Sequence, residues 1–329
     1  MSDHKPGTPR RARLTALWLT PWLLLAALAM HAAAVPAPAN APGAAAAVDP
    51  QAERSAVNEW RTKRVNSLTS DSGWLTLAGL FWLKEGENTF GRNPKSSLAL
   101  DNPALAENAG SFEVNGHKVR FVARPQSGVT HQGKPVTTLD LAFDATEEPT
   151  VLESGSLRFF VIERSGNLGV RVRDLNNPRR LNFLGLSYFP VDTGWVFKAH
   201  FESYQPARHI KIVNILGMEE EDVSPGAVVF TKDGHEWRLD TVLEQPGDKE
   251  LFIMFADATS GHDTYGAGRF LYIPMPENGS ALLDFNKAYN PPCALNDFAT
   301  CPLPPPQNRL KLRIEAGEKT YAGAPAHHS

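Results

Sequence analysis

From Gly73 onward, short apolar and β-branched segments alternate with clusters of glycine, proline, asparagine and aspartate. Segments of this kind predict strands, and many short strands in succession are typical of β-sandwiches and barrels. The predicted strands are Trp74–Leu83, Lys118–Ala123, Pro135–Phe143, Leu157–Glu163, Gly169–Arg173, Val196–Phe201, His209–Ile215, Ala227–Phe230 and Glu236–Leu239. Only Gln51–Ser67, with Trp60 and Arg64 at helical spacing, predicts a helix. We therefore expect an all-β protein of two packed β-sandwich or barrel lobes behind one short N-terminal helix.

The first 34 residues have the composition of a secretory signal peptide. Four basic residues and one acidic residue precede position 14, and residues 14–30 are almost wholly apolar before a run of small residues. This pattern predicts export and cleavage, so we expect the mature protein in the periplasm or secreted. The paired Arg10 and Arg11 leave twin-arginine export open. An uncleaved anchor is the alternative, because about 17–25 apolar residues span a bilayer, and only then would the membrane be a partner.

Composition also sets the remaining boundaries. We expect a signal peptide over residues 1–34, a disordered linker over 35–50, the helix over 51–72, a first β-lobe over 73–190, a second over 191–321 and a disordered tail over 322–329. Without residues 1–34, the chain has 29 basic and 35 acidic residues, a net charge of −6. This mildly acidic charge argues against nucleic acid as a partner. The sequence leaves the oligomeric state open.

The stretch from Leu251 to Cys301 has the densest mixture of strand-like runs and irregular polar residues. Its runs Leu251–Ala256, Phe270–Ile273 and Ala281–Phe285 predict three consecutive antiparallel strands. At one edge of such a meander, four polar side chains should lie close together, with Arg269 opposite Asn286. The four are Asp257, Arg269, Asp284 and Asn286.

Tyrosine and asparagine side chains flank this predicted cluster, and an aromatic ring beside polar groups suits a carbohydrate or a similar polar ligand. We expect a module of the cell envelope that binds a small molecule or a glycan. The expected contact residues are Tyr265, Arg269, Asp284, Asn286, Tyr289 and Asn290. One alternative is a hydrolase that uses Asp257 and Asp284 as acid and base. Another is a structural protein in which an ion-pair network ties the strand ends together, and whether the chain is an enzyme stays open.

The two cysteines, Cys293 and Cys301, stand close together between proline-rich segments. In an exported chain this spacing predicts a disulfide. A thiolate metal site is the alternative, but the nearest histidine, His262, is distant in sequence. No established metal motif occurs, so we expect no metal and no cofactor. The acidic run Glu219–Asp222 predicts a solvated loop.

Four longer motifs resemble the bacterial family catalogued as domain of unknown function 1684. They are GWLTLAGLFWLKEGENTFGR (Gly73–Arg92), YFPVDTGW (Tyr188–Trp195), DATSGHDTYGAGRFLY (Asp257–Tyr272) and DFNKAYNPPCALNDFATCPLPPPQNRL (Asp284–Leu310). The similarity spans Val57 to Tyr321. It implies family membership and draws attention to the last two motifs, without implying an activity.

A second resemblance lies in the first β-lobe. The run FGRNPKSSLAL (Phe90–Leu100), followed by a strand bounded by glycines, is similar to the opening of a forkhead-associated domain. Such domains are β-sandwiches that bind phosphothreonine through loop residues and carry a Ser-x-x-His step. The corresponding region here reads AENAGSFEVNGHKV and lacks that step. The resemblance therefore implies the fold of residues 73–190 rather than phosphopeptide binding.

Overall fold

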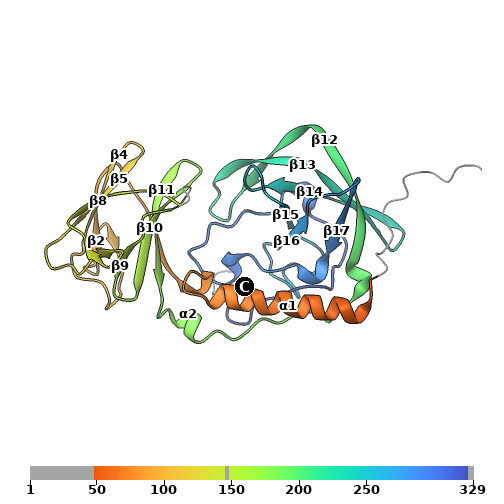
Figure 1. Cartoon of the computed structure of the whole chain (residues 1–329), viewed down its shortest axis with the longest axis horizontal. Helices are drawn as coiled ribbons and strands as arrows, with labels where there is room; N and C mark the ends of the chain where they lie inside the picture. The colour runs from red at the N-terminus through yellow and green to blue at the C-terminus, as the bar shows by residue number, and fades with distance from the viewer. Residues whose placement is uncertain (1–47, 145–147, 325–329) are drawn as a thin grey trace, which may run out of the picture. The chain divides into compact units, whose positions relative to one another are not determined.

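The computed structural model of this 329-residue chain describes residues 48–144 and 148–324 (Figure 1). The predicted signal peptide, the linker up to residue 47 and the tail from residue 325 lie outside the described residues. The described part is mostly β, with 44% of residues in strands and 14% in helices. No helix within these ranges has the length and apolarity to cross a membrane.

Helix α1 (Pro50–Thr69) confirms the predicted N-terminal helix. Asp49 caps it by accepting a hydrogen bond from the backbone N–H of Gln51 at 2.8 Å, and Pro50 stands at a position where a missing N–H costs nothing. The buried positions of α1 are Glu53, Val57 and Leu68. Glu53 therefore places a carboxyl group inside the protein.

Residues 77–174 form the first lobe, which has two sheets in the orders β1-β11-β10-β9-β6-β7 and β3-β2-β4-β5-β8. Aromatic side chains from both sheets, Phe90, Phe112, Phe121 and Phe159, meet in its core, with ring centroids 4.9–6.3 Å apart. The strands are β1 (Leu77–Trp82), β2 (Gly86–Gly91), β3 (Leu98–Ala99), β4 (Gly110–Asn115), β5 (Lys118–Ala123), β6 (Thr130–His131), β7 (Lys134–Pro135), β8 (Thr138–Leu141), β9 (Leu152–Ser154), β10 (Leu157–Arg164) and β11 (Asn167–Asp174).

The second lobe is one six-stranded antiparallel sheet in the order β16-β15-β14-β13-β12-β17. Its end strands, β16 and β17, approach each other, so the sheet is a nearly closed barrel around a second apolar core. The strands are β12 (Val196–Val213), β13 (Glu219–Lys232), β14 (His235–Leu243), β15 (Glu250–Phe255), β16 (Arg269–Pro274) and β17 (Ser280–Asp284). The two lobes confirm the predicted all-β class.

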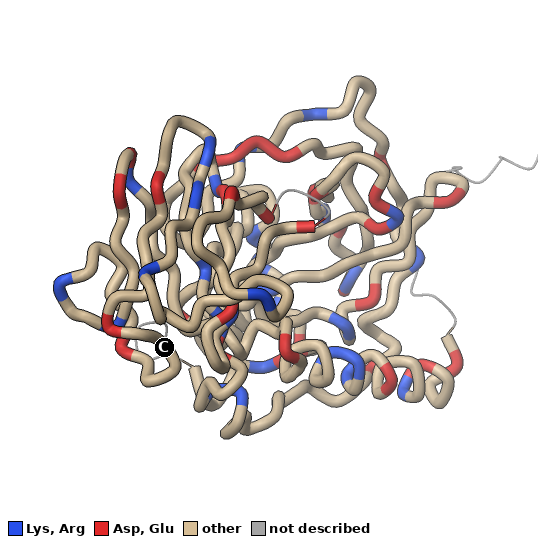
Figure 2. Tube along the Cα trace, turned by 60° about the vertical axis from the view of Figure 1, so that its left-hand side comes forward, with Lys and Arg blue, Asp and Glu red and all other residues tan. Residues whose placement is uncertain are grey.

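Short helices connect these elements and follow the last strand. They are α2 (Pro178–Leu181), η1 (Trp74–Thr76), η2 (Thr193–Trp195), η3 (Phe285–Lys287), η4 (Pro292–Ala294) and η5 (Pro306–Asn308). The acidic run Glu219–Asp222 belongs to strand β13, so its prediction as a loop was wrong. It is one continuous acidic stretch of the tube in Figure 2.

All three strands of the predicted meander are present, but only the pairing of the first two is correct. Strands β15 and β16 pair with Phe255 opposite Arg269. Strand β17 pairs with β12 instead, where Asp284 lies opposite Val196, so Asn286 is not the partner of Arg269. The reason is closure of the barrel, because β17 satisfies its backbone on β12 at the far end of the same sheet. Tyr289 then forms the bridge to Phe270 of β16.

Candidate functional site

The six residues predicted to contact a ligand are mostly inside the protein. Tyr265, Arg269, Asp284, Asn286 and Asn290 are buried, and Tyr289 is half-buried. Only Asp284 and Tyr289 among the six line a cavity described below. The ligand contacts proposed for the other four stay a prediction, and their observed partners belong to the chain itself.

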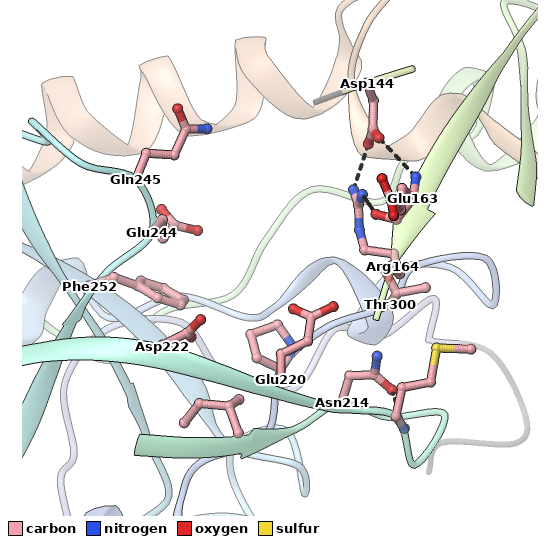
Figure 3. A pocket seen from close by; sticks show the side chains of 13 residues that line it. Asp144, Glu163, Arg164, Asn214, Glu220, Asp222, Glu244, Gln245, Phe252 and Thr300 are labelled. Atoms are coloured by element: carbon pink, nitrogen blue, oxygen red, sulfur yellow. Dashed lines mark hydrogen bonds and ion pairs between the residues drawn. The ribbon is translucent and has the colours of Figure 1, made fainter. Parts of the chain in front are cut away.

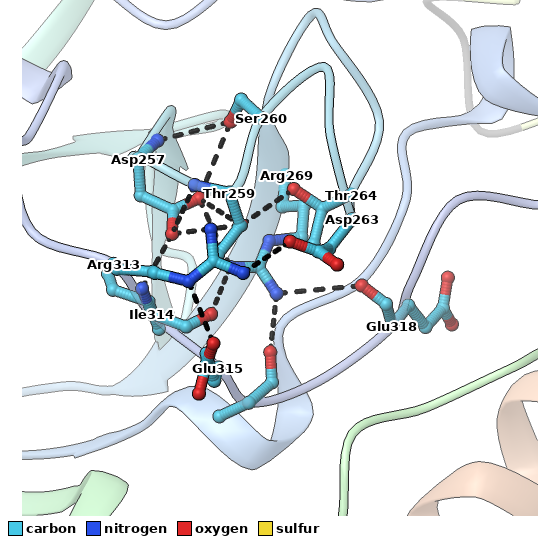
Figure 4. A network of polar contacts seen from close by, with 11 residues as sticks. Asp257, Thr259, Ser260, Asp263, Thr264, Arg269, Arg313, Ile314, Glu315 and Glu318 are labelled. Atoms are coloured by element: carbon cyan, nitrogen blue, oxygen red, sulfur yellow. Dashed lines mark hydrogen bonds and ion pairs between the residues drawn. The ribbon is translucent and has the colours of Figure 1, made fainter.

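Arg269 lies at the centre of a buried polar network (Figure 4). Its Nη2 donates to the backbone oxygen of Ile314 at 3.0 Å and lies 3.3 Å from Oδ1 of Asp257. Its Nη1 donates to the backbone oxygen of Ala316 and lies 3.5 Å from that of Glu318. Burial lowers the pKa of Arg269, and the Asp257 carboxylate opposes that shift. One guanidinium therefore fixes the C-terminal segment against the end of β16.

Asp257 completes this network from the end of β15. Its Oδ2 accepts the backbone N–H of Ile314 at 2.7 Å, and both of its oxygens lie 2.9 Å from Oγ1 of Thr259 (Figure 4). The carboxylate thus has partners on all sides. The predicted proximity of Asp257 and Arg269 is found, but the donors around Asp257 match a structural ion pair better than an acid or base that exchanges protons with substrate.

The remaining predicted residues also bond to backbone. Asn286 donates through Nδ2 to the backbone oxygen of Asp192 at 3.0 Å and to Oδ1 of Asp284 at 3.1 Å. Asn290 donates its backbone N–H to Glu318 at 2.8 Å and its Nδ2 to the backbone oxygen of Lys319 at 2.7 Å. The side chains of Asn286 and Asn290 therefore hold separate loops together by hydrogen bonds. Asp284 and Asp257 consequently have different partners, and no contact between them is observed among the described residues.

The cavity that Asp284 and Tyr289 line has a volume of about 480 Å³, and we call it the α1 cavity. It is bounded by α1 on one side and by β16, β17 and η3 on the other. Its lining residues are Ala56, Glu59, Trp60, Lys63, Glu250, Tyr272, Pro274, Leu282, Asp284, Lys287 and Tyr289. It combines aromatic rings with carboxylates and ammonium groups, which is the composition of a site for a small polar ligand.

The wall of this cavity that α1 forms was not predicted from the sequence. Glu53, in the first turn of α1, is 7% exposed and lies within hydrogen-bonding reach of the Asp284 carboxyl. Burial, and then the charge of Asp284, raises the pKa of Glu53 to about 7. The signal in the sequence is the spacing of Glu53, Val57 and Trp60, which places a carboxyl on the same helix face as two apolar residues.

A second cavity, about 390 Å³ in volume, has walls from both lobes, and we call it the junction cavity (Figure 3). Carboxylates outnumber cations in its walls, and Arg164 is already paired with Asp144 at 2.8 Å. Burial, Glu220 and Glu244 raise the pKa of Asp222 to about 6. Its lining residues are Asp144, Glu163, Arg164, Ile212, Asn214, Met218, Glu220, Asp222, Glu244, Gln245, Phe252, Thr300 and Pro302. Such walls oppose anionic ligands.

The two cysteines lie side by side, Cys293 in η4 and Cys301 in the loop that follows it. In the structure both are buried free cysteines, and the backbone N–H of Cys293 donates to Sγ of Cys301 at 3.1 Å. A hydrogen bond from Cys301 lowers the pKa of Cys293, whereas burial raises the pKa of Cys301. The disulfide is not formed here and stays a prediction. Within the described ranges, no group of three His, Cys, Asp or Glu side chains is spaced to hold a metal ion.

Comparison with known proteins adds a family but no activity. A family model described as "Protein of unknown function (DUF1684)" matches residues 181–319. An uncharacterised protein of Haloarcula marismortui, solved by solution NMR, is 30% identical, and the match covers 43% of this chain and 79% of that one, with a TM-score of 0.37. No curated protein matches.

Two forkhead-associated domains are also among the similar solved structures. One, from a study of phosphothreonine-dependent interactions, is 19% identical, and the match covers 29% of this chain and 92% of that one, with a TM-score of 0.21. The other is the FhaA domain, solved with the intracellular domain of another protein. It is 18% identical, and the match covers 28% of this chain and 96% of that one, also with a TM-score of 0.21. Both resemble the N-terminal half.

Proposed function

The chain belongs to the DUF1684 family of proteins of unknown function, and for this member we propose that the α1 cavity binds a small neutral polar ligand of the carbohydrate class. The observation that carries this proposal is the group of three aromatic rings in the cavity. Tyr272 and Tyr289 are stacked, with centroids 6.2 Å apart and an interplanar angle of 15°. Trp60 packs on Tyr289 at 6.2 Å and 51°.

Aromatic side chains in an open cavity favour ligands that have one apolar face. Tyr272 is 38% exposed, which is unusual for a ring that contacts other rings in a core. A pyranose ring presents C–H bonds on one face and hydroxyls around its edge, so it can pack on an aromatic ring and hydrogen-bond at the same time. The platform of Trp60, Tyr272 and Tyr289 supports a ligand of that shape.

The polar groups around the platform support a neutral ligand rather than an ion. Lys63 is paired with Glu59 at 2.5 Å, and Lys287 with Asp284 at 2.9 Å. Glu250 adds one more carboxylate. Because the lysines are already neutralised, the rim presents adjacent donors and acceptors instead of one strong charge. Vicinal hydroxyl groups, which donate and accept, match such a rim.

We also propose that this binding takes place outside the cytoplasm, in the periplasm or after secretion. The support is the basic start of the chain followed by the apolar run of residues 14–30, both of which lie outside the described residues. Intact-mass analysis of the full-length chain from the periplasm of a bacterial host should give a mature protein that begins near residue 35. A chain that keeps residues 1–34 would overturn cleavage.

The binding proposal is tested by calorimetric titration of the protein with neutral oligosaccharides, chitotriose and maltotriose among them. Tyr272→Ala should weaken binding at least tenfold, because loss of an aromatic contact at the centre of a site removes more than about 1.4 kcal/mol. Tyr204→Ala is the matched control, since Tyr204 is a half-buried tyrosine of the same lobe that bonds Asp240 and does not line the cavity.

Two results would refute the proposal: no heat with any sugar at millimolar concentration, or equal affinities of the Tyr272 and Tyr204 variants. The same samples decide the hydrolase alternative, because reducing ends accumulate only if the ligand is cleaved. The donors that surround Asp257 support the view that binding occurs without cleavage.

A further inference from the structure

Two carboxyl groups from distant parts of the chain meet at the edge of the α1 cavity. Glu53 comes from the first turn of α1 and Asp284 from the end of β17, and they are 7% and 5% exposed. The two groups lie within hydrogen-bonding reach of each other. Within the described residues, Oε1 of Glu53 is buried and receives no hydrogen bond, and Oδ2 of Asp284 has only the ammonium group of Lys287 beside it, at 2.9 Å. The two carboxyl groups therefore have no hydrogen between them unless one of them is protonated.

A proton shared between the Glu53 and Asp284 carboxyl groups supplies the missing hydrogen. Two neighbouring carboxylates with little access to water repel each other strongly, so a pair of this kind holds one proton under conditions where isolated carboxyls would be ionised. Lys287 of η3 decides which member keeps the charge, because its Nζ lies 2.9 Å from Oδ2 of Asp284. Asp284 is therefore the carboxylate, and Glu53 is the protonated partner that donates to it.

The position of Glu53 links this proton to the cavity. One turn after Glu53, helix α1 begins to line the cavity with Ala56, and it continues with Glu59, Trp60 and Lys63. On the side of the cavity opposite α1, Asp284 is itself a lining residue, and η3 contacts α1. A hydrogen bond between Glu53 and Asp284 thus holds the first turn of α1 against the floor of the cavity, whereas two charges there would push it away.

We propose that the Glu53–Asp284 pair is a proton-dependent clamp that closes α1 over the cavity, so that occupancy of the cavity requires the shared proton. This inference rests on the proposed function for its ligand, but the clamp itself exists without one. The charged groups that act on Glu53 are Asp284 of β17 and Lys287 of η3. Of the other charges that line the cavity, Glu59 and Lys63 of α1 neutralise each other, and Glu250 of β15 adds one carboxylate.

The sign of the effect follows from the two protonation states. Because the pKa of Glu53 is raised to about 7, the clamp is almost fully formed at pH 5–6 and is lost as the pH rises through 7. If only the protonated form binds, about nine tenths of the protein is competent at pH 6 and about one tenth at pH 8, so the dissociation constant rises about tenfold.

The experiment measures chitotriose and maltotriose affinity by calorimetry at pH 6, 7 and 8 for three proteins. The wild type should lose about tenfold in affinity between pH 6 and pH 8. Glu53→Gln, which mimics the protonated acid, should bind as tightly at pH 8 as the wild type does at pH 6. Glu236→Gln, which changes an exposed carboxylate of β14 that does not line the cavity, should keep the wild-type pH dependence. A pH dependence that survives in Glu53→Gln, or that is absent from the wild type, overturns the proposal.

A ligand-free measurement separates this inference from the proposed function. The side-chain carboxyl carbon of Glu53, followed by carbon-13 NMR, should titrate with a midpoint near pH 7, and hydrogen exchange in the first two turns of α1 should become faster above it. If no sugar binds, this result still supports the clamp while the proposed function fails. A midpoint below pH 5 overturns the clamp whatever the sugars do.

Discussion

Replacement of Arg269 by methionine should destabilise the protein strongly, because it breaks the network that joins the strand ends to the C-terminal segment. Methionine retains most of the apolar stem but leaves the Asp257 carboxylate without its cation, in a position where both side chains of the pair are fully buried. Removal of one partner of a buried ion pair costs about 3–5 kcal/mol. The backbone oxygens of Ile314 and Ala316 also lose a donor.

The magnitude is large compared with the total stability of a protein domain, which is about 5–15 kcal/mol. We therefore expect Arg269→Met to lose about 3–5 kcal/mol of unfolding free energy in urea, followed by tryptophan fluorescence and circular dichroism. Arg313→Met is the matched control. Arg313 belongs to the same region but is 47% exposed, and it pairs with Asp263 and Glu315 at the surface. Its loss should cost less than about 1 kcal/mol.

The reasoning fails if Arg269→Met and Arg313→Met unfold at the same urea concentration, or if Arg269→Met loses less than about 1 kcal/mol. A second substitution tests the cause. Asp257→Asn in the Arg269→Met background removes the unpaired charge, so the double variant should be more stable than Arg269→Met alone. If it is less stable, the network acts through hydrogen bonds and not through the charge of Asp257.

Two further predictions concern groups outside this network. Because burial, Glu220 and Glu244 raise the pKa of Asp222 to about 6, its ionisation opposes folding increasingly between pH 4 and 6 and fully above that range. Asp222→Asn should therefore stabilise the protein by about 1 kcal/mol at pH 8 and by almost nothing at pH 4, as measured by urea unfolding. Thiol titration of denatured, periplasmically expressed protein should find no free thiol if Cys293 and Cys301 form the predicted disulfide. Two free thiols would show that the reduced state of the structure is the stable one.

Much of the fold could be predicted from the sequence, because it is encoded locally. The predicted strand Lys118–Ala123 is found with the same ends as β5, since turn residues stand close to both ends. Barrel closure is different, because the choice of β12 rather than β16 as the partner of β17 depends on how far the whole sheet twists. No short pattern in Ala281–Phe285 carries that information.

The candidate site could be predicted only in part, for a related reason. The proximity of Asp257 and Arg269 follows from one hairpin, so the sequence shows it. The α1 cavity needs a helix at the start of the chain to pack on strands near its end, and such a long-range contact leaves no signature in either segment. Glu53 looks like an ordinary acidic residue in the first turn of a helix. Its proposed role as the protonated partner of Asp284 depends on its burial beside that residue, which only the structure shows.

The buried network around Arg269 is connected to the α1 cavity by a short series of contacts. Arg269 fixes the backbone near Glu318, and the Glu318 carboxylate accepts from Arg64 of α1 at 3.1 Å. Arg64 in turn lies over the ring of Tyr289, 4.5 Å from its centroid, and Tyr289 lines the α1 cavity. The buried network therefore positions a wall of the cavity through Glu318 and Arg64 without touching its contents. A variant such as Arg269→Met should weaken ligand binding as well as folding, so reduced affinity in that variant would not make Arg269 a ligand contact.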